Sequence, residues 1–298
     1  MQWRGRRQSS NIEDRRGGGV KKVGGVSIIG LIIAFVLWQV FGISPETTMG
    51  VTQQIQTQTQ SSAPATETAD MAESREFVAT VLADTEDVWT PIFAQAGQRY
   101  QPPSLVLFSG AVQSACGSAT SASGPFYCPA DQKVYLDTQF FRDMRTQMNI
   151  GGEQNSTELT RTDLAGDFAQ AYVIAHEVGH HVQTLLGISQ QVRQAQAQAS
   201  TAAANNLSVR QELQADCFAG MWARHNHERT QFLQPGDIEE ALDAAEKIGD
   251  DYLQRQARGH AVPDSFTHGT SAQRKRWFYR GFETGDVNQC DTFATREL

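Results

Sequence analysis

Apolar residues recur at helical spacing along much of the chain beyond residue 71. In the clearest stretch they lie three or four positions apart, at Phe168, Ala171, Ile174, Ala175 and Val178. This spacing predicts an amphipathic helix, which Gly187 is suited to end. The ranges 73–89 and 237–248 show the same periodicity, and Pro91 is expected to break the first of these two helices.

Strand-like runs are fewer and shorter. Residues 105–108 and 133–137 are rich in strand-forming residues, with Phe126 and Tyr127 between them. The order of helix, strands and further helices predicts an α+β fold that is mainly helical, with a small antiparallel sheet. The polar range 149–163 predicts a flexible loop, and the range 194–206, which lacks aromatic residues, is either a helix or a mobile lid.

An uncharged apolar stretch, residues 26–43, precedes this region. It is close to the ~20 residues that cross a bilayer, and Trp38 suits the membrane interface. Residues 1–22 hold seven Arg and Lys residues against two acidic ones, whereas the whole chain has a net charge of −8. This asymmetry predicts a single-pass protein of the cytoplasmic membrane, with its N-terminus inside and the rest of the chain periplasmic or extracellular.

A cleaved signal peptide is the alternative, but the apolar run is longer than a usual signal core and no A-x-A-like site follows it. A buried core helix does not suit such flanks. Residues 45–71 are rich in Thr, Gln, Ser and Ala, which predicts a flexible linker. We therefore expect a basic cytoplasmic tail over residues 1–22, a transmembrane anchor over 23–44, this linker, and one folded domain over 72–298. The acidity of that domain argues against nucleic-acid binding.

The predicted helix around residue 176 contains the sequence His176-Glu177-Val178-Gly179-His180. Residues four positions apart share one face of a helix, so both imidazoles can reach a single Zn²⁺ ion. Glu177 follows the first histidine and is placed to take a proton from a water molecule on the metal. The motif therefore predicts one catalytic zinc ion per chain.

A catalytic zinc site also needs a third protein ligand. Glu212 and Asp216 lie four positions apart on a further predicted helix. We expect Glu212 to bind the metal and Asp216 to orient a ligand histidine. A mildly repulsive acidic pair on the helix surface is the alternative.

The four cysteines, Cys116, Cys128, Cys217 and Cys290, fit an oxidising compartment. Cys116 and Cys128 flank a loop rich in Gly, Ser and Ala and are expected to form a local disulfide, which leaves Cys217 and Cys290 as partners. A Cys/His zinc site is disfavoured because no C-x-x-C spacing occurs. Two other roles are open to Cys217, as a nucleophile or as a buried thiol.

The chain resembles the bacterial neutral zinc metallopeptidases, a family of small membrane-anchored proteins. The resemblance is carried by residues 3–7, 12–17, 124–129, 167–183, 212–220 and 263–271. It implies a zinc-dependent peptidase with a zincin-like fold that acts on a peptide or protein substrate.

A wider similarity to the gluzincin proteases, which include the CAAX prenyl proteases, implies roles for single residues. Glu212 would be the third zinc ligand and Asp216 its supporting partner. His268 and Arg274 would polarise the substrate carbonyl or stabilise the oxyanion, although Gly269 stands where that pattern has proline; His268 could equally be a hydrogen-bonded loop residue. The strand near residues 134–136 would lie at the edge of the substrate cleft, with an interior strand as the alternative.

Zinc-dependent endopeptidase activity is thus the expected function, with Glu177 as general base. One alternative is a membrane-tethered binding module that keeps zinc for structure only; another is an amidohydrolase acting on cell-wall peptides. The remaining histidines lack ligand spacing and are expected at the surface. They are His181, His225, His227 and His260.

Overall fold

The computed structural model describes residues 1–16, 68–146, 148, 150 and 166–298. The chain divides into two units. One consists of Met1–Arg15 together with Asp70–Leu298, and the other is Arg16–Ala69. Nearly all of the second unit lies outside the described residues, so the fold below is that of the first unit.

A four-stranded sheet has the order β1-β2-β6-β5. Its strands are β1 (Ile12–Asp14), β2 (Ser104–Phe108), β6 (Lys133–Asp137) and β5 (Phe126–Cys128). Strands β1, β2 and β6 run parallel, and only β5 is antiparallel to its neighbour. The main sheet is therefore mixed and not antiparallel as predicted. Antiparallel pairing occurs between β5 and β6 and in a separate hairpin of β3 (Ala111–Ser114) and β4 (Gly117–Thr120). Strand β6 lies inside the sheet, so the expected cleft edge at residues 134–136 is also wrong.

Helices make up most of the described unit, as predicted. They are α3 (Ala69–Gln95), α4 (Thr138–Thr146), α5 (Asp167–Leu185), α6 (Ile188–Gln196), α7 (Thr201–Thr230), α8 (Asp237–Lys247), α9 (Asp250–Arg258) and α10 (Ser271–Thr284). Short 3₁₀ turns occupy Ser121–Ser123, Pro263–Ser265 and Val287–Cys290. Helix α3 continues past Pro91, which lies within it, so the predicted break is wrong. Gly187 does follow the end of α5, in the left-handed conformation that favours glycine.

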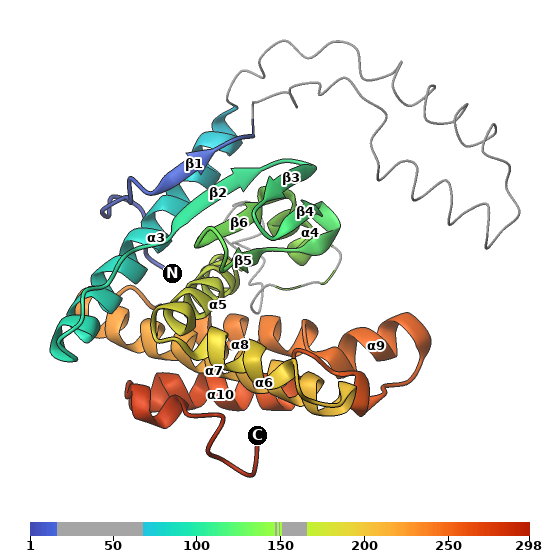
Figure 1. Cartoon of the computed structure of the whole chain (residues 1–298). Helices are drawn as coiled ribbons and strands as arrows, with labels where there is room; N and C mark the ends of the chain where they lie inside the picture. Colours follow the sequence, from blue (N-terminus) through green and yellow to red (C-terminus); the bar gives the residue numbers. More distant parts are fainter. Residues whose placement is uncertain (17–67, 147, 149, 151–165) are drawn as a thin grey trace, which may run out of the picture. The chain divides into compact units, whose positions relative to one another are not determined.

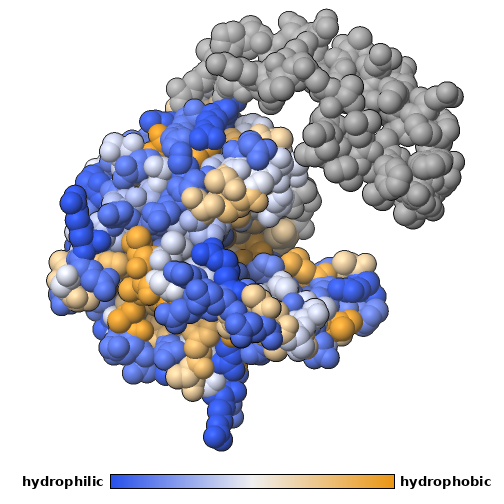
Figure 2. Space-filling model, in the orientation of Figure 1, coloured by the Kyte–Doolittle hydropathy of each residue, from blue (hydrophilic) through white to orange (hydrophobic). Residues whose placement is uncertain are grey.

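Helix α5 lies between the sheet and a layer formed by α7, α8 and α10 (Figure 1). It contacts β5 and β6 on one side and α7 and α8 on the other. The core of large apolar residues fills the space between these layers, and the face shown in Figure 2 is mostly hydrophilic with small, separate apolar groups. An apolar helix buried on all sides is well suited to hold side chains in fixed positions.

Two glycine contacts bring the helices unusually close. A Cβ atom on Gly179 of α5 would lie 3.0 Å from the carbonyl oxygen of Ala215 in α7. At the crossing of α7 and α10, a Cβ atom on Gly220 would overlap the carbonyl of Phe278, and one on Gly281 would overlap that of Cys217. Side chains larger than hydrogen at these positions would push the three helices apart.

The first residues of the chain are part of the folded unit. The Met1 amine lies 2.8 Å from Asp167 Oδ1 and 3.1 Å from Asp237 Oδ1, and it is fully buried. The indole of Trp3 packs edge-on against Phe77 with ring centroids 5.3 Å apart. Asp167 begins helix α5, so the chain start is fixed to the helix that contains the histidine motif.

The N-terminal arginines pair with carboxylates of α3. The Arg6 Nη2 atom lies 2.6 Å from Asp84 Oδ1. The two Nη atoms of Arg7 lie 2.9 Å from Glu86 and 2.7 Å from Asp87. These basic residues therefore balance acidic residues of the same folded unit.

Residues 1–15 of the predicted tail over residues 1–22 fold together with residues 70–298, and β1 pairs with β2 within that unit. The predicted membrane topology stays an expectation from the sequence. The predicted anchor, residues 23–44, and most of the predicted linker and of the 149–163 loop lie outside the described residues. Within the described part of the chain, no helix is both long and apolar enough to cross a membrane.

Candidate metal centre

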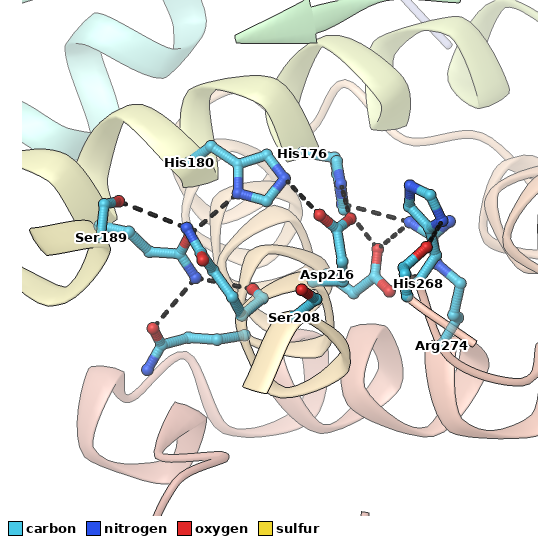
Figure 3. A network of polar contacts seen from close by, with 12 residues as sticks. His176, His180, Ser189, Ser208, Asp216, His268 and Arg274 are labelled. Carbon is cyan, nitrogen blue, oxygen red and sulfur yellow. Dashed lines mark hydrogen bonds and ion pairs between the residues drawn. The ribbon is translucent and has the colours of Figure 1, made fainter. Parts of the chain in front are cut away.

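Helices α5 and α7 bring three side chains of the predicted site together. His176 Nε2 lies 3.2 Å from Glu212 Oε2, and His180 Nε2 lies 3.4 Å from Glu212 Oε1. One ligand atom from each of the three residues lies within 4.8 Å of the others. The close approach at Gly179 and Ala215 makes this possible because it sets α7 directly against the histidine face of α5. Figure 3 shows both imidazoles projecting from α5 towards α7.

This arrangement fits a zinc ion. A tetrahedral ion with bonds of about 2.0–2.1 Å holds its ligand atoms roughly 3.3 Å apart, close to the separations seen here. Both Nδ1 atoms face oxygen acceptors, so each neutral ring carries its proton on Nδ1 and turns the lone pair of Nε2 towards Glu212. Lone pairs facing a carboxylate at this distance require a positive charge between them, which either a proton or a metal ion supplies.

The electrostatics of the three groups agree with this requirement. Burial lowers the pKa of His176, but Asp216 and Glu212 more than offset it and raise the pKa to about 10. Burial likewise lowers the pKa of His180, and Glu212 raises it above its ordinary value. Burial raises the pKa of Glu212, yet the two histidines hold it well below its ordinary range. The pocket thus favours positive charge beside an ionised carboxylate.

Asp216 supports His176 from behind. Its Oδ1 atom lies 2.8 Å from His176 Nδ1 and accepts a hydrogen bond from the Tyr172 hydroxyl at 2.6 Å. The side chain is completely buried. A carboxylate on the outer nitrogen of a ligand histidine orients the ring and strengthens it as a ligand. The structure therefore places Asp216 where the sequence predicted it.

Arg274 does not lie where the sequence predicted. The resemblance implied a contact with the substrate carbonyl, but the guanidinium is 3% exposed and hydrogen-bonds to Asp216 through Nε and Nη2. It also reaches the Tyr172 hydroxyl at 3.3 Å. Arg274 therefore lies behind His176, in contact with the carboxylate that supports it.

His268 remains open to the surface. Its side chain is 53% exposed, and Nδ1 lies 3.3 Å from Asp250 Oδ1. The other Asp250 oxygen accepts the backbone N–H groups of residues 267, 268 and 269, which fixes the loop. The hydrogen bond from Asp250 raises the pKa of His268, against the opposing effect of burial. Gly269 has φ +93°, which proline cannot adopt, so the departure from the gluzincin pattern reflects a different backbone here.

Sequence reasoning missed two residues that contact this cluster. Tyr172 lies four positions before His176, and Gln183 lies three after His180, with its Oε1 atom 2.9 Å from His180 Nδ1. Helical spacing on the motif face was the signal that could have found both. His181 was expected at the surface but is 1% exposed; it lies 2.6 Å from the Gln101 carbonyl and 3.1 Å from the Tyr127 hydroxyl, and burial lowers its pKa.

The remaining predictions have mixed outcomes. Both expected disulfides are present, Cys116–Cys128 and Cys217–Cys290, which excludes a free thiol at Cys217. His260 is exposed as predicted, whereas His225 and His227 are half-buried.

The family model described as "Putative neutral zinc metallopeptidase" matches residues 1–293. The chain belongs to this family. It is 46% identical to "Uncharacterized protein YpfJ" of Escherichia coli over 303 residues, which cover 99% of both chains. It is 43% identical to "Uncharacterized protein Rv2575" of Mycobacterium tuberculosis over 220 residues, which cover 71% of this chain and 68% of the relative. No solved structure matches.

Proposed function

We propose that this protein is a zinc-dependent endopeptidase. The observation that carries the proposal is the spacing of His176, His180 and Glu212, whose ligand atoms lie where a tetrahedral ion would need them. Only three side chains of the described residues form this cluster, so one coordination position is left for water or substrate. An open fourth position is typical of catalytic rather than structural zinc.

Glu177 is the proposed general base. It is 8% exposed, and among the described residues none donates a hydrogen bond to its carboxylate. When bound, zinc lowers the pKa of a coordinated water towards about 7 and polarises the scissile carbonyl. Glu177 then accepts the proton of the attacking water and later passes it to the leaving amine. His268, exposed and held by Asp250, is the proposed donor to the oxyanion.

Among the described residues, strand β5 is an edge strand of the sheet, and it contacts α5, the helix that contains the two histidines. The unpaired edge of a strand can accept a peptide through backbone hydrogen bonds. We therefore place the substrate along residues 126–128, instead of along the interior strand β6.

An oxidising, extracytoplasmic compartment is the proposed location. Both disulfides support it, because such bonds persist mainly outside the cytoplasm. Since residues 1–15 fold with the disulfide-containing unit, the proposal places the N-terminus in the same compartment. Membrane attachment through residues 26–43 stays a prediction from the sequence.

The test uses the full chain, because residues 1–15 belong to the folded unit. Zinc content and digestion of a broad peptide library are compared for the wild type, Glu177→Gln and Glu212→Gln. We expect one zinc per chain and cleavage in the wild type, full zinc without cleavage in Glu177→Gln, and loss of zinc in Glu212→Gln. Cleavage retained in pure Glu177→Gln would remove this residue as the base. A zinc-loaded wild type that cleaves neither this library nor cell-wall peptides would instead support a non-catalytic binding module.

A further inference from the structure

His180 is oriented by a glutamine on its own helix. Its Nδ1 atom lies 2.9 Å from Gln183 Oε1. Because an amide oxygen only accepts, the proton of the neutral ring must be on Nδ1, and the lone pair of Nε2 is free for a metal. Gln183 thus serves His180 as Asp216 serves His176, although it has no charge.

Two further groups fix which way the Gln183 amide turns. Its Nε2 atom donates to the Gln211 carbonyl at 2.7 Å and to Gln214 Oε1 at 3.1 Å. Gln214 in turn donates from Nε2 to the Cys290 carbonyl at 3.0 Å. Gln183 is fully buried and Gln214 is 5% exposed, so losing one of these hydrogen bonds would leave a buried polar group without a partner.

Only one arrangement of donors and acceptors satisfies this series of hydrogen bonds from the Cys290 carbonyl to His180. The Cys290 carbonyl can only accept, so Gln214 must turn its NH₂ group towards it and its oxygen towards Gln183. Gln183 must then present its NH₂ group to Gln214 and its oxygen to His180. The Gln211 and Cys290 carbonyls therefore determine together, through the two amides, which nitrogen of His180 carries the proton.

A disulfide fixes the position of that carbonyl. Cys290 is bonded to Cys217 of α7, next to Asp216 in the sequence, and both cysteines are fully buried. The chain after Cys290 is bound to the same helix, since Thr292 Oγ1 donates to the Arg210 carbonyl at 2.6 Å. Without the covalent link, the short turn at Val287–Cys290 would lose its direct bond to α7.

We propose that Gln183 and Gln214 are positioning residues for His180 and that the Cys217–Cys290 disulfide controls zinc affinity through them. The inference rests on the proposed zinc site, but it goes beyond it by coupling metal binding to the oxidation state of a remote bond. Loss of the disulfide frees the Cys290 carbonyl and allows the Gln214 amide to turn. Gln183 is then held by the Gln211 carbonyl alone, which weakens the preference of His180 for the Nδ1 proton.

The first test measures zinc affinity of the full chain by competition with a chelator, together with the absorption spectrum of the Co²⁺ form. We expect Gln183→Met to weaken zinc binding about 10- to 100-fold, the usual effect of losing a partner behind a ligand. Gln183→Glu keeps an acceptor for His180 but loses the donor to the Gln211 carbonyl, so it should recover part of that affinity. A merely structural role would lower the melting temperature of the metal-free protein in both variants without this rescue.

The second test removes the disulfide in two backgrounds. Replacing Cys217 and Cys290 by serine should weaken zinc binding in the wild type. The effect should be smaller in Gln214→Met, because that variant already lacks the hydrogen bonds that join the Cys290 carbonyl to Gln183. Replacing Cys116 and Cys128 by serine is the matched control and should leave zinc affinity unchanged. If the Cys217/Cys290 variant does not fold, the variant with Cys116 and Cys128 replaced by serine is used, since Cys217–Cys290 is then the remaining disulfide. Zinc affinity is compared before and after this bond is reduced with a phosphine.

The outcomes separate this inference from the proposed function. A wild type that binds no zinc defeats the proposed function itself. A wild type that binds zinc, with Gln183→Met binding equally well, overturns only the positioning role. Equal losses on disulfide removal in the wild type and in Gln214→Met overturn the coupling, because the effect would then bypass the hydrogen bonds of Gln214.

Discussion

Arg274 binds both carboxylate oxygens of Asp216, with Nε 2.9 Å from Oδ2 and Nη2 2.9 Å from Oδ1. Burial raises the pKa of Asp216, but Arg274 and His176 more than offset it and lower the pKa to about 2. Arg274 and His176 together thus keep Asp216 ionised, with Arg274 as the larger effect. The pair stabilises the charge behind the metal centre.

Replacing Arg274 should therefore damage stability and metal binding together. In Arg274→Gln the buried Asp216 charge loses its main partner, and we expect the free energy of unfolding to fall by about 3–5 kcal/mol. Zinc affinity should fall as well, since Asp216 then takes up a proton more readily. Chemical denaturation and chelator competition measure the two effects. Normal stability and zinc affinity together with a low kcat would contradict this prediction and support the contact between Arg274 and substrate that the resemblance implied.

His268 should affect turnover without affecting the metal. As a donor to the oxyanion it acts in its protonated form, so His268→Gln should lower kcat by about 10²–10³ at unchanged zinc content. Asp250 raises the pKa of His268, so activity should persist above the ordinary histidine range and fall as the pH rises through the raised value.

Asp250→Asn gives the matched comparison. The amide oxygen can still accept backbone N–H groups of the loop, but the carboxylate charge that raises the pKa of His268 is gone. The alkaline limb of kcat/KM should consequently move to lower pH. An unmoved limb would show that another group sets it.

The Met1 amine should contribute to stability in a pH-dependent way. Burial lowers its pKa, but Asp167 and Asp237 more than offset this and raise the pKa above 8.0. A group whose pKa is raised on folding stabilises the protein fully below its unfolded pKa and loses this effect as the pH rises through the folded value. We expect the free energy of unfolding to decline above about pH 8 for this reason.

Two added residues before Met1 test this directly. The extension removes the ammonium from two buried carboxylates and should cost about 3–5 kcal/mol at neutral pH. The extended protein should also lack the decline above pH 8. The same two residues after Leu298, whose carbonyl makes only an exposed contact with Arg276, are the control and should be nearly neutral. Equal stabilities of the two extended proteins would contradict the prediction.

Local spacing was enough to predict the centre of the site. His176 and His180 share a helix face by their separation alone, and Glu212 and Asp216 do the same on α7. The pairing of the two helices depends on Gly179 and Ala215, which look unremarkable in the sequence. Arg274 was assigned to the site through a resemblance, and that pattern does not specify which side of His176 the residue occupies.

The sequence-based predictions failed where residues pair with partners far along the chain. Strand β1 is only three residues long and pairs with residues 105–107, more than ninety positions later, so no local periodicity marks it. The charges of Arg6 and Arg7 resembled a topology signal because their partners on α3 lie far along the chain. His181 was misplaced for a similar reason, since the strand that buries it comes from residues 126–128.

The ion pairs of Met1 also impose an order on biosynthesis. Asp237 is made 236 residues after its partner Met1, so this ion pair cannot form until most of the described chain has been synthesised. Strand β1 can pair with β2 earlier. The ion-pair cluster of Met1 with Asp167 and Asp237 is complete only after Asp237 has been made. Contacts of such large sequence separation are slow to form. Maturation of the metal centre is therefore expected only after translation has passed α8, when Asp237 can first bind the Met1 amine.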